Sequence, residues 1–122
     1  MAGKKRVLYV EDNADNRMLI RRLLMAEGFE LLEAANAEQM WAILQTQRPD
    51  LILMDLHLPG IDGFTLTHQL TTHPRYGDIP VVALTADVLR DTPQRCAAAG
   101  CVGYITKPID VDTFVAQLRR YL

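Results

Sequence analysis

Near the middle of the chain lies the stretch Asp50-Leu51-Ile52-Leu53-Met54-Asp55, an apolar run bounded by two acids. The run does not alternate between apolar and polar residues, which is the pattern of a strand covered on both faces. Strands of this kind occur in parallel sheets that carry helices on both sides. The stretch therefore predicts a central parallel strand that ends at Asp55.

Segments of strand length and helix length alternate on both sides of this stretch. Gly28 and Gly100 follow helical segments, and Pro49 ends another. We predict strands at residues 6–10, 29–33, 51–54, 79–84 and 102–105, and helices at residues 13–26, 37–47, 64–72, 92–100 and 111–122. Strand–helix units joined by short connections predict an α/β fold of the flavodoxin-like type. It is a doubly wound, five-stranded parallel sheet of order 2-1-3-4-5 with helices on both faces.

The first and last helices have apolar residues at helical spacing. In the first we expect the apolar face to consist of Met18, Leu19, Leu23 and Ala26. In the last we expect a stripe of Val111, Phe114, Val115, Leu118, Tyr121 and Leu122. Before the fourth helix, Thr92 is predicted to be a cap and Pro93 the first helical residue.

Length and composition limit what the chain can be. Its 122 residues fit one domain, so we expect residues 1–122 to fold as a unit. The formal net charge of −2 leaves no basic excess for neutralising phosphates, so we expect no DNA binding by itself. The spacing of Cys96 and Cys101 fits neither a disulfide framework nor a zinc site, and we expect two buried or half-buried thiols.

The N-terminal residues also bear on location. A basic start is followed by a short apolar run and then by Glu11, which does not fit a signal peptide. No run approaches the roughly 20 apolar residues of a membrane span. We therefore expect a cytoplasmic protein with no membrane attachment.

Polar side chains follow four of the predicted strands at the point where each strand ends. Glu11 and Asp12 follow the first, Asp55 the third, Thr85 the fourth and Lys107 the fifth. The carboxyl ends of parallel strands meet at one edge of a sheet, where ligands bind in folds of this class. We expect these side chains to converge there, while the outer second strand ends in alanines and contributes none.

Such a group of residues has a definite chemistry. The carboxylates of Glu11, Asp12 and Asp55 repel one another unless a cation compensates, and Mg²⁺ takes one or two carboxylates together with phosphate oxygens. Lys107 supplies a compact positive charge and Thr85 a hydroxyl donor for a phosphoryl group. A carboxylate can itself be the nucleophile that forms an acyl phosphate.

These residues resemble the receiver domain of two-component response regulators. Single-domain regulators of the cell-division type are the most similar subgroup, and receivers cut from hybrid kinases look similar too. The resemblance covers nearly the whole chain and implies that residues 1–122 are a receiver, or response regulatory, domain. It is carried by Val10-Glu11-Asp12-Asn13, Asp50-Leu51-Ile52-Leu53-Met54-Asp55, Leu58-Pro59-Gly60-Ile61-Asp62-Gly63, Ile79-Pro80-Val81-Val82-Ala83-Leu84-Thr85-Ala86 and Tyr104-Ile105-Thr106-Lys107-Pro108.

The resemblance implies roles for the acidic residues. Asp55 is then the phosphoacceptor and also a metal ligand. Glu11, Asp12 and the backbone carbonyl of His57 complete the Mg²⁺ site. The side chains of His57 and Asp87 lie where relatives tune the loss of the phosphate, and an imidazole or a carboxylate there would act on an attacking water.

It also implies a switch and its partners. Thr85 and Lys107 contact the phosphate, Thr85 and Tyr104 form the switch pair, and Lys107 precedes a cis peptide bond to Pro108. The phosphoryl group would come from a sensor histidine kinase or a histidine phosphotransfer protein. The face made by the fourth helix, fifth strand and fifth helix would then bind a separate downstream protein. We expect no enzyme activity beyond self-catalysed phosphoryl acceptance and autodephosphorylation.

Three other readings remain at this point. A flavodoxin-like nucleotide binder has the same strand order, although it favours a Ser/Thr/Gly-rich loop after the first strand over the acidic one here. A phosphatase of the haloacid-dehalogenase type also uses an aspartate and Mg²⁺, but it carries its Asp-x-Asp pair at the first strand. A pseudo-receiver that only docks usually lacks one of the acids, the threonine or the lysine.

Overall fold

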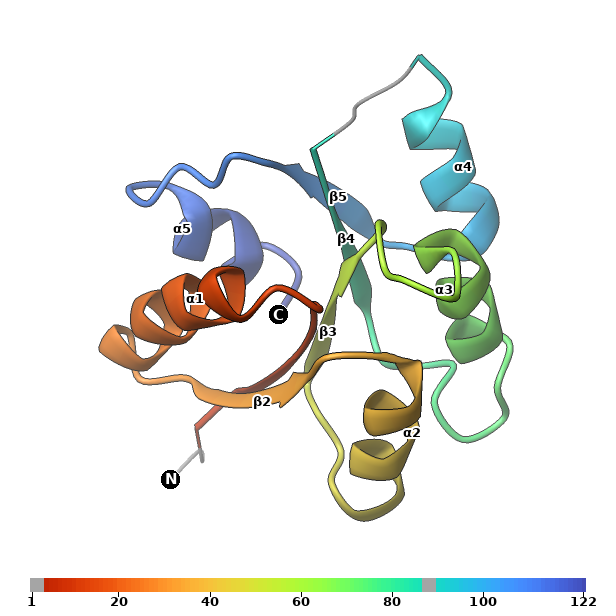
Figure 1. Cartoon of the computed structure of the whole chain (residues 1–122), viewed down its shortest axis with the longest axis horizontal. Coiled ribbons are helices and arrows are strands. Elements are labelled where there is room, and N and C mark those ends of the chain that lie inside the picture. The colour runs from red at the N-terminus through yellow and green to blue at the C-terminus, as the bar shows by residue number, and fades with distance from the viewer. Residues whose placement is uncertain (1–3, 87–89) are drawn as a thin grey trace.

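The computed structural model describes residues 4–86 and 90–122 as an open, twisted sheet with helices on both faces (Figure 1). All strand pairs are parallel and the order is β2-β1-β3-β4-β5, so the predicted fold class and strand order are confirmed. The strands are β1 (Arg6–Val10), β2 (Glu30–Ala34), β3 (Leu51–Asp55), β4 (Val81–Thr85) and β5 (Gly103–Thr106).

The helices divide into two layers, with one group on each face of the sheet (Figure 1). One layer is formed by α1 (Ala14–Ala26) and α5 (Phe114–Arg119). The other is formed by α2 (Ala37–Thr46), α3 (Gly63–Thr71) and α4 (Thr92–Ala99).

The central position of β3 in the sheet explains why its sequence does not alternate between apolar and polar residues. Leu51 and Leu53 belong to the apolar cluster beneath α1 and α5, whereas Ile52 and Met54 belong to the cluster beneath α2 and α3. All four side chains are fully buried. Because both faces of the strand are covered, each residue packs into one core or the other, and Asp55 follows at the carboxyl end.

The first helix is rotated relative to the predicted apolar face. Ile20 and Leu24 are its buried residues, and Leu23 packs partly buried against the apolar cluster that contains them. Met18, Leu19 and Ala26 are exposed, so the predicted face is wrong except at Leu23. Asn16, one turn before Ile20, donates a hydrogen bond to the side chain of Glu11. That polar contact places residues 16, 20 and 24 on the inner side of the helix, at i, i+4 spacing.

The last helix is shorter than residues 111–122. It begins at Phe114, where the backbone N–H groups of Thr113 and Phe114 both donate to the carbonyl of Asp110 in the preceding turn. Phe114 and Leu118 are fully buried, but Val111 is about half exposed at 52%. Val115 and Tyr121 pack partly buried against the apolar cluster that contains Phe114 and Leu118, whereas Leu122 is exposed, so the predicted stripe is confirmed except at its first and last residues.

Most other boundaries lie within one residue of the prediction, whereas the start of β4 and the cap of α4 differ from it. β4 begins at Val81, not residue 79, because Pro80 has no N–H for the ladder and the N–H of Ile79 bonds within the preceding turn. Thr92 is the first residue of α4 rather than its cap, and its side chain is buried. Asp91 occupies the cap position without a side-chain hydrogen bond to the helix.

Candidate functional site

An acidic cluster lies at the carboxyl ends of β1 and β3. Glu11 and Asp55 are buried, with 1% and 2% of their surfaces exposed, whereas Asp12 lies on the exposed rim. One carboxylate oxygen from each of the three residues lies within 4.8 Å of the other two. Such a set of hard oxygen ligands, two of them desolvated, fits Mg²⁺.

Lys107 lies between the two buried acids. Its Nζ is 3.1 Å from Oε1 of Glu11 and 3.4 Å from Oδ2 of Asp55. The lysine follows β5, and its backbone N–H donates to the carbonyl of Thr85 at 2.7 Å. The Lys107–Pro108 peptide bond is cis. The ends of β1, β3, β4 and β5 thus bring their polar residues to one edge, as the strand order predicts.

The two buried carboxyl groups, Glu11 and Asp55, have their pKa values shifted in opposite directions. Burial raises the pKa of Asp55 to about 6, and the neighbouring Glu11 adds to the rise. Burial also opposes ionisation of Glu11, but hydrogen bonds from Asp55, Asn16 and Lys107 outweigh it and lower the pKa of Glu11 to about 2. Without a metal, Asp55 is therefore the acid that more readily holds a proton.

Glu11 has partners that the sequence analysis missed. Its Oε1 accepts hydrogen bonds from Tyr9 Oη at 3.2 Å and from Asn16 Nδ2 at 2.7 Å. Its backbone carbonyl accepts one from Arg17 at 2.7 Å. A signal existed for Tyr9, because residues two apart in a strand point to the same face and Tyr9 precedes Glu11 by two. Burial and the nearby carboxylates raise the pKa of Tyr9, so its hydroxyl remains a donor.

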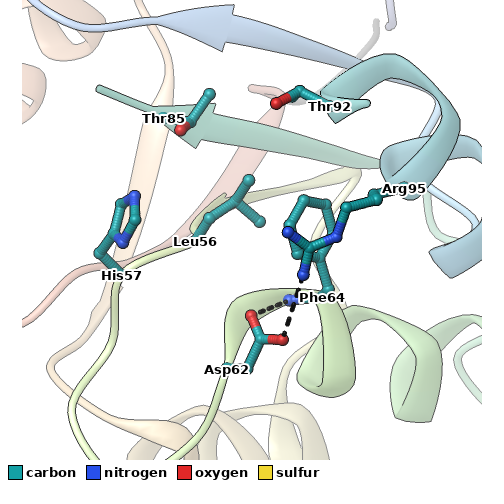
Figure 2. A pocket seen from close by; sticks show the side chains of 7 residues that line it. All are labelled: Leu56, His57, Asp62, Phe64, Thr85, Thr92 and Arg95. Carbon is teal, nitrogen blue, oxygen red and sulfur yellow. Dashed lines mark hydrogen bonds and ion pairs between the residues drawn. The ribbon is translucent and has the colours of Figure 1, made fainter. Parts of the chain in front are cut away.

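The loop after β3 closes one side of the site. The backbone N–H of His57 donates to Oδ1 of Asp55 at 3.0 Å, while the His57 side chain is exposed. Thr85 is buried at the end of the next strand, β4. A cavity of about 250 Å³ adjoins these residues, and Figure 2 shows its lining of Leu56, His57, Asp62, Phe64, Thr85, Thr92 and Arg95.

Arg95 joins α4 to the start of α3 across this cavity (Figure 2). Its guanidinium lies over the Phe64 ring, 4.2 Å from the ring centre, and 3.9 Å from Oδ2 of Asp62. Asp62 in turn caps α3, because its side chain accepts from the Phe64 N–H.

Other predicted residues lie apart from the acidic cluster or beyond the described chain. Tyr104 is half-buried on β5 and packs against the cluster that contains Leu56, Ala83 and Cys96. Cys96 is buried and Cys101 half-buried, both as free thiols, as expected. Asp87, predicted to tune the loss of phosphate, lies outside the described residues.

Gly63, at the start of α3, allows a close approach to the loop after Asp55. A Cβ atom there would lie 2.5 Å from Leu56 Cα and 2.8 Å from the Asp55 carbonyl oxygen. These are backbone atoms that cannot move aside, so Gly63→Ala is expected to lower the free energy of unfolding by about 2–4 kcal/mol, measured by urea denaturation.

Gly103→Ala is the matched control for this substitution. A Cβ at Gly103 meets only the far end of the Tyr121 side chain, which can swing away, so the expected loss is at most about 1 kcal/mol. Equal losses in the two variants would contradict a special role for the contact between α3 and the loop after β3.

A doubly wound parallel sheet with a buried aspartate, two further acids and a lysine at its strand ends places the chain in the flavodoxin-like class of folds, with an acidic site at the carboxyl edge of the sheet. The family model of the response regulator receiver domain matches residues 7–119, and the chain belongs to this family. This confirms the resemblance seen in the sequence.

Relatives of known sequence or structure cover almost the whole chain. The polar-differentiation response regulator DivK of Brucella anthropi is 38% identical over 118 residues, which are 97% of this chain and 96% of DivK. The chemotaxis response regulator CheY4 of Vibrio cholerae superimposes with a TM-score of 0.90 at 28% identity, covering 98% and 99% of the two chains.

A third relative carries a metal. The receiver domain of sensor histidine kinase PA1611 from Pseudomonas aeruginosa superimposes with a TM-score of 0.85 at 32% identity, covering 98% of each chain, and holds a magnesium ion in its active-site cleft. Receiver domains are phosphorylation-dependent switches of two-component systems that bind Mg²⁺ at an acidic site and interact with histidine kinases and downstream targets. Within residues 4–86 and 90–122, no helix is long and apolar enough to cross a membrane.

Proposed function

We propose that residues 1–122 form a receiver domain that accepts a phosphoryl group on Asp55 from a sensor histidine kinase or a histidine phosphotransfer protein. The observation that supports this most directly is the pairing of buried Asp55 with Lys107 at 3.4 Å, beside two further acids. A carboxylate oxygen of Asp55 attacks the phosphorus and forms a P–O bond. The P–N bond of the phosphohistidine breaks, and its electron pair stays on the imidazole.

The surrounding residues stabilise the charge of this transfer. Glu11, Asp12, Asp55 and the backbone carbonyl of His57 would hold Mg²⁺, which supplies positive charge next to the phosphoryl oxygens. Lys107 turns from the carboxylates to a phosphoryl oxygen, and the hydroxyl of Thr85 donates to another. The magnesium ion in the cleft of the PA1611 receiver supports this assignment.

The output is a shift between two arrangements of the protein. We propose that phosphorylated Asp55 draws Thr85 toward the phosphate and that Tyr104 turns inward with it. The surface of α4, β5 and α5 then changes its affinity for a separate downstream protein, in the cytoplasm where the ATP-dependent kinases act. The His57 side chain and Asp87 would set the lifetime of the phosphate, and comparing that lifetime in wild type and His57→Ala measures the contribution of His57.

Acetyl phosphate tests the proposal without a known kinase. Intact-mass spectrometry of the protein with acetyl phosphate and Mg²⁺ is expected to show a gain of about 80 Da, one phosphoryl group per chain. Without Mg²⁺ the gain should be largely lost, because the acidic cluster then repels the donor.

Two other results would favour other functions. Repeated turnover of a generic phosphate ester would indicate a phosphatase rather than a switch. If no adduct forms with acetyl phosphate or with a phosphorylated phosphotransfer protein, although Mg²⁺ binds, a docking-only pseudo-receiver is favoured.

A further inference from the structure

Three donors from outside the acidic cluster reach the Glu11 carboxylate, and all three reach the same oxygen. Among the described residues, Oε1 accepts from Asn16 at 2.7 Å, from Lys107 at 3.1 Å and from Tyr9 at 3.2 Å. These donors saturate the lone pairs of a single oxygen. Oε2 accepts from none of these three donors, so we assign this oxygen to the cation position shared with Asp12 and Asp55.

The three donors are not equivalent. Tyr9 is fully buried in β1, within the apolar cluster beneath α1 and α5. Asn16 lies in the first turn of α1, where its backbone N–H donates to the capping side chain of Asn13 at 2.9 Å. Lys107, in contrast, leaves Glu11 for the phosphoryl group in the proposed function. Tyr9 and Asn16 are thus the donors that stay in place throughout.

The backbone of Glu11 is fixed independently of its side chain. Its N–H donates to the carbonyl of Ala34 on β2 at 2.9 Å, and its carbonyl accepts from Arg17 at 2.7 Å. The remaining freedom lies in the side-chain torsions of Glu11, and the contacts with Tyr9 and Asn16 restrict them. Fixing these torsions before a cation binds lowers the entropy cost of binding.

We propose that Tyr9 and Asn16 are positioning residues of the metal site, which hold the Glu11 carboxylate with Oε2 toward Mg²⁺ and thereby set the affinity for the ion. The inference rests on the proposed function, because it assumes that the acidic cluster is the Mg²⁺ site. Partners outside the ligand shell that orient a ligand typically have strong effects on metal affinity.

Tyr9→Phe tests this with little change in shape. We expect the dissociation constant for Mg²⁺, measured by isothermal titration calorimetry, to rise at least about fivefold. At saturating Mg²⁺ the rate of phosphorylation by acetyl phosphate should return close to that of wild type, because Tyr9 does not touch the reacting atoms. Asn16→Ala should raise the same dissociation constant, and it avoids any change in the buried strand.

Tyr76→Phe is the matched control. The Tyr76 hydroxyl is also buried and donates to the carbonyl of Leu44 at 3.1 Å, under α2 and away from the acids. Both tyrosine variants lose one buried hydrogen bond, so the control shows what the loss of such a bond does by itself. Only Tyr9→Phe should weaken Mg²⁺ binding.

The outcomes separate this inference from the proposed function. If wild type binds Mg²⁺ and Asp12→Ala weakens that binding, the acidic cluster is the site. Unchanged or tighter Mg²⁺ binding in both Tyr9→Phe and Asn16→Ala would then overturn the positioning role alone. If wild type does not bind Mg²⁺, the proposed site and the inference fail together.

Discussion

Asp55→Asn is expected to abolish the Mg²⁺-dependent phosphoryl adduct. Asparagine has nearly the shape of aspartate and keeps an acceptor for the His57 N–H, which lies 3.0 Å from Oδ1. It lacks the negative oxygen that attacks phosphorus, so no acyl phosphate can form. Intact-mass spectrometry after incubation with acetyl phosphate and Mg²⁺ measures the loss.

Asp50→Asn is the control for this loss. Asp50 directly precedes the same strand, β3, and its exposed carboxylate accepts from the Arg6 N–H at 2.8 Å, far from the acidic cluster. Asp50→Asn removes one negative charge, as Asp55→Asn does, and should leave the yield of the phosphoryl adduct unchanged. An adduct of normal yield on Asp55→Asn would mean that another residue accepts the phosphoryl group.

Asp55→Asn should also stabilise the metal-free protein. Burial and the neighbouring Glu11 raise the pKa of Asp55 from 3.8 to about 6. The folded protein therefore favours protonated Asp55, and this contribution to stability is fully present below about pH 4 and is lost as the pH rises through 6. At pH 8 the ionised, buried Asp55 therefore destabilises the fold by about 2–3 kcal/mol, at about 1.4 kcal/mol per pKa unit. Asparagine removes this cost.

Urea denaturation with a chelator present tests the sign. Asp55→Asn should be more stable than wild type by about 2 kcal/mol at pH 8, and the difference should shrink toward pH 4.5. The pKa of Glu11 is shifted the other way, from 4.5 to about 2, so its contribution is lost only as the pH falls through that lower range. A gap that is equal at both pH values would contradict the raised pKa of Asp55.

The fold follows from the sequence because apolar patterns determine it. A run such as Leu51 to Met54 must be buried on both faces, and few arrangements of alternating strands and helices allow this. The strand order then brings Glu11, Asp55 and Lys107 to one edge without further information. The convergence of the acids and the lysine could therefore be predicted before any coordinates.

Features set by polar contacts between elements could not be predicted this way. The face of α1 was misjudged because Met18 and Leu19 are apolar, while the rotation of the helix follows the bond from Asn16 to Glu11. A hydrophobic pattern predicts which apolar side chains are buried, but it does not predict the direction in which a single polar side chain such as that of Asn16 must point. The contact of Arg95 with Phe64 and Asp62 could not be predicted from the sequence for the same reason.

Lys107→Gln is expected to slow phosphorylation of Asp55 by at least about 100-fold, the usual cost of removing one preorganised charge partner of a transition state. Nζ of Lys107 lies 3.1 Å from Glu11 and 3.4 Å from Asp55, so the lysine is already next to a carboxylate oxygen of the proposed phosphoacceptor. Stopped-flow or mass measurements at saturating Mg²⁺ give the rate. Lys5→Gln, which removes an exposed lysine before β1, controls for net charge.

Mg²⁺ affinity distinguishes this catalytic role from a merely structural one. Lys107 competes with a cation for the same two carboxylates, so Lys107→Gln should bind Mg²⁺ as tightly as wild type or more tightly, although its phosphorylation is slow. Loss of rate and of Mg²⁺ affinity together would mean that the lysine only holds Glu11 and Asp55 in place. A normal rate would remove Lys107 from the phosphoryl contacts, and the positive charge of the transfer would then have to come from the metal alone.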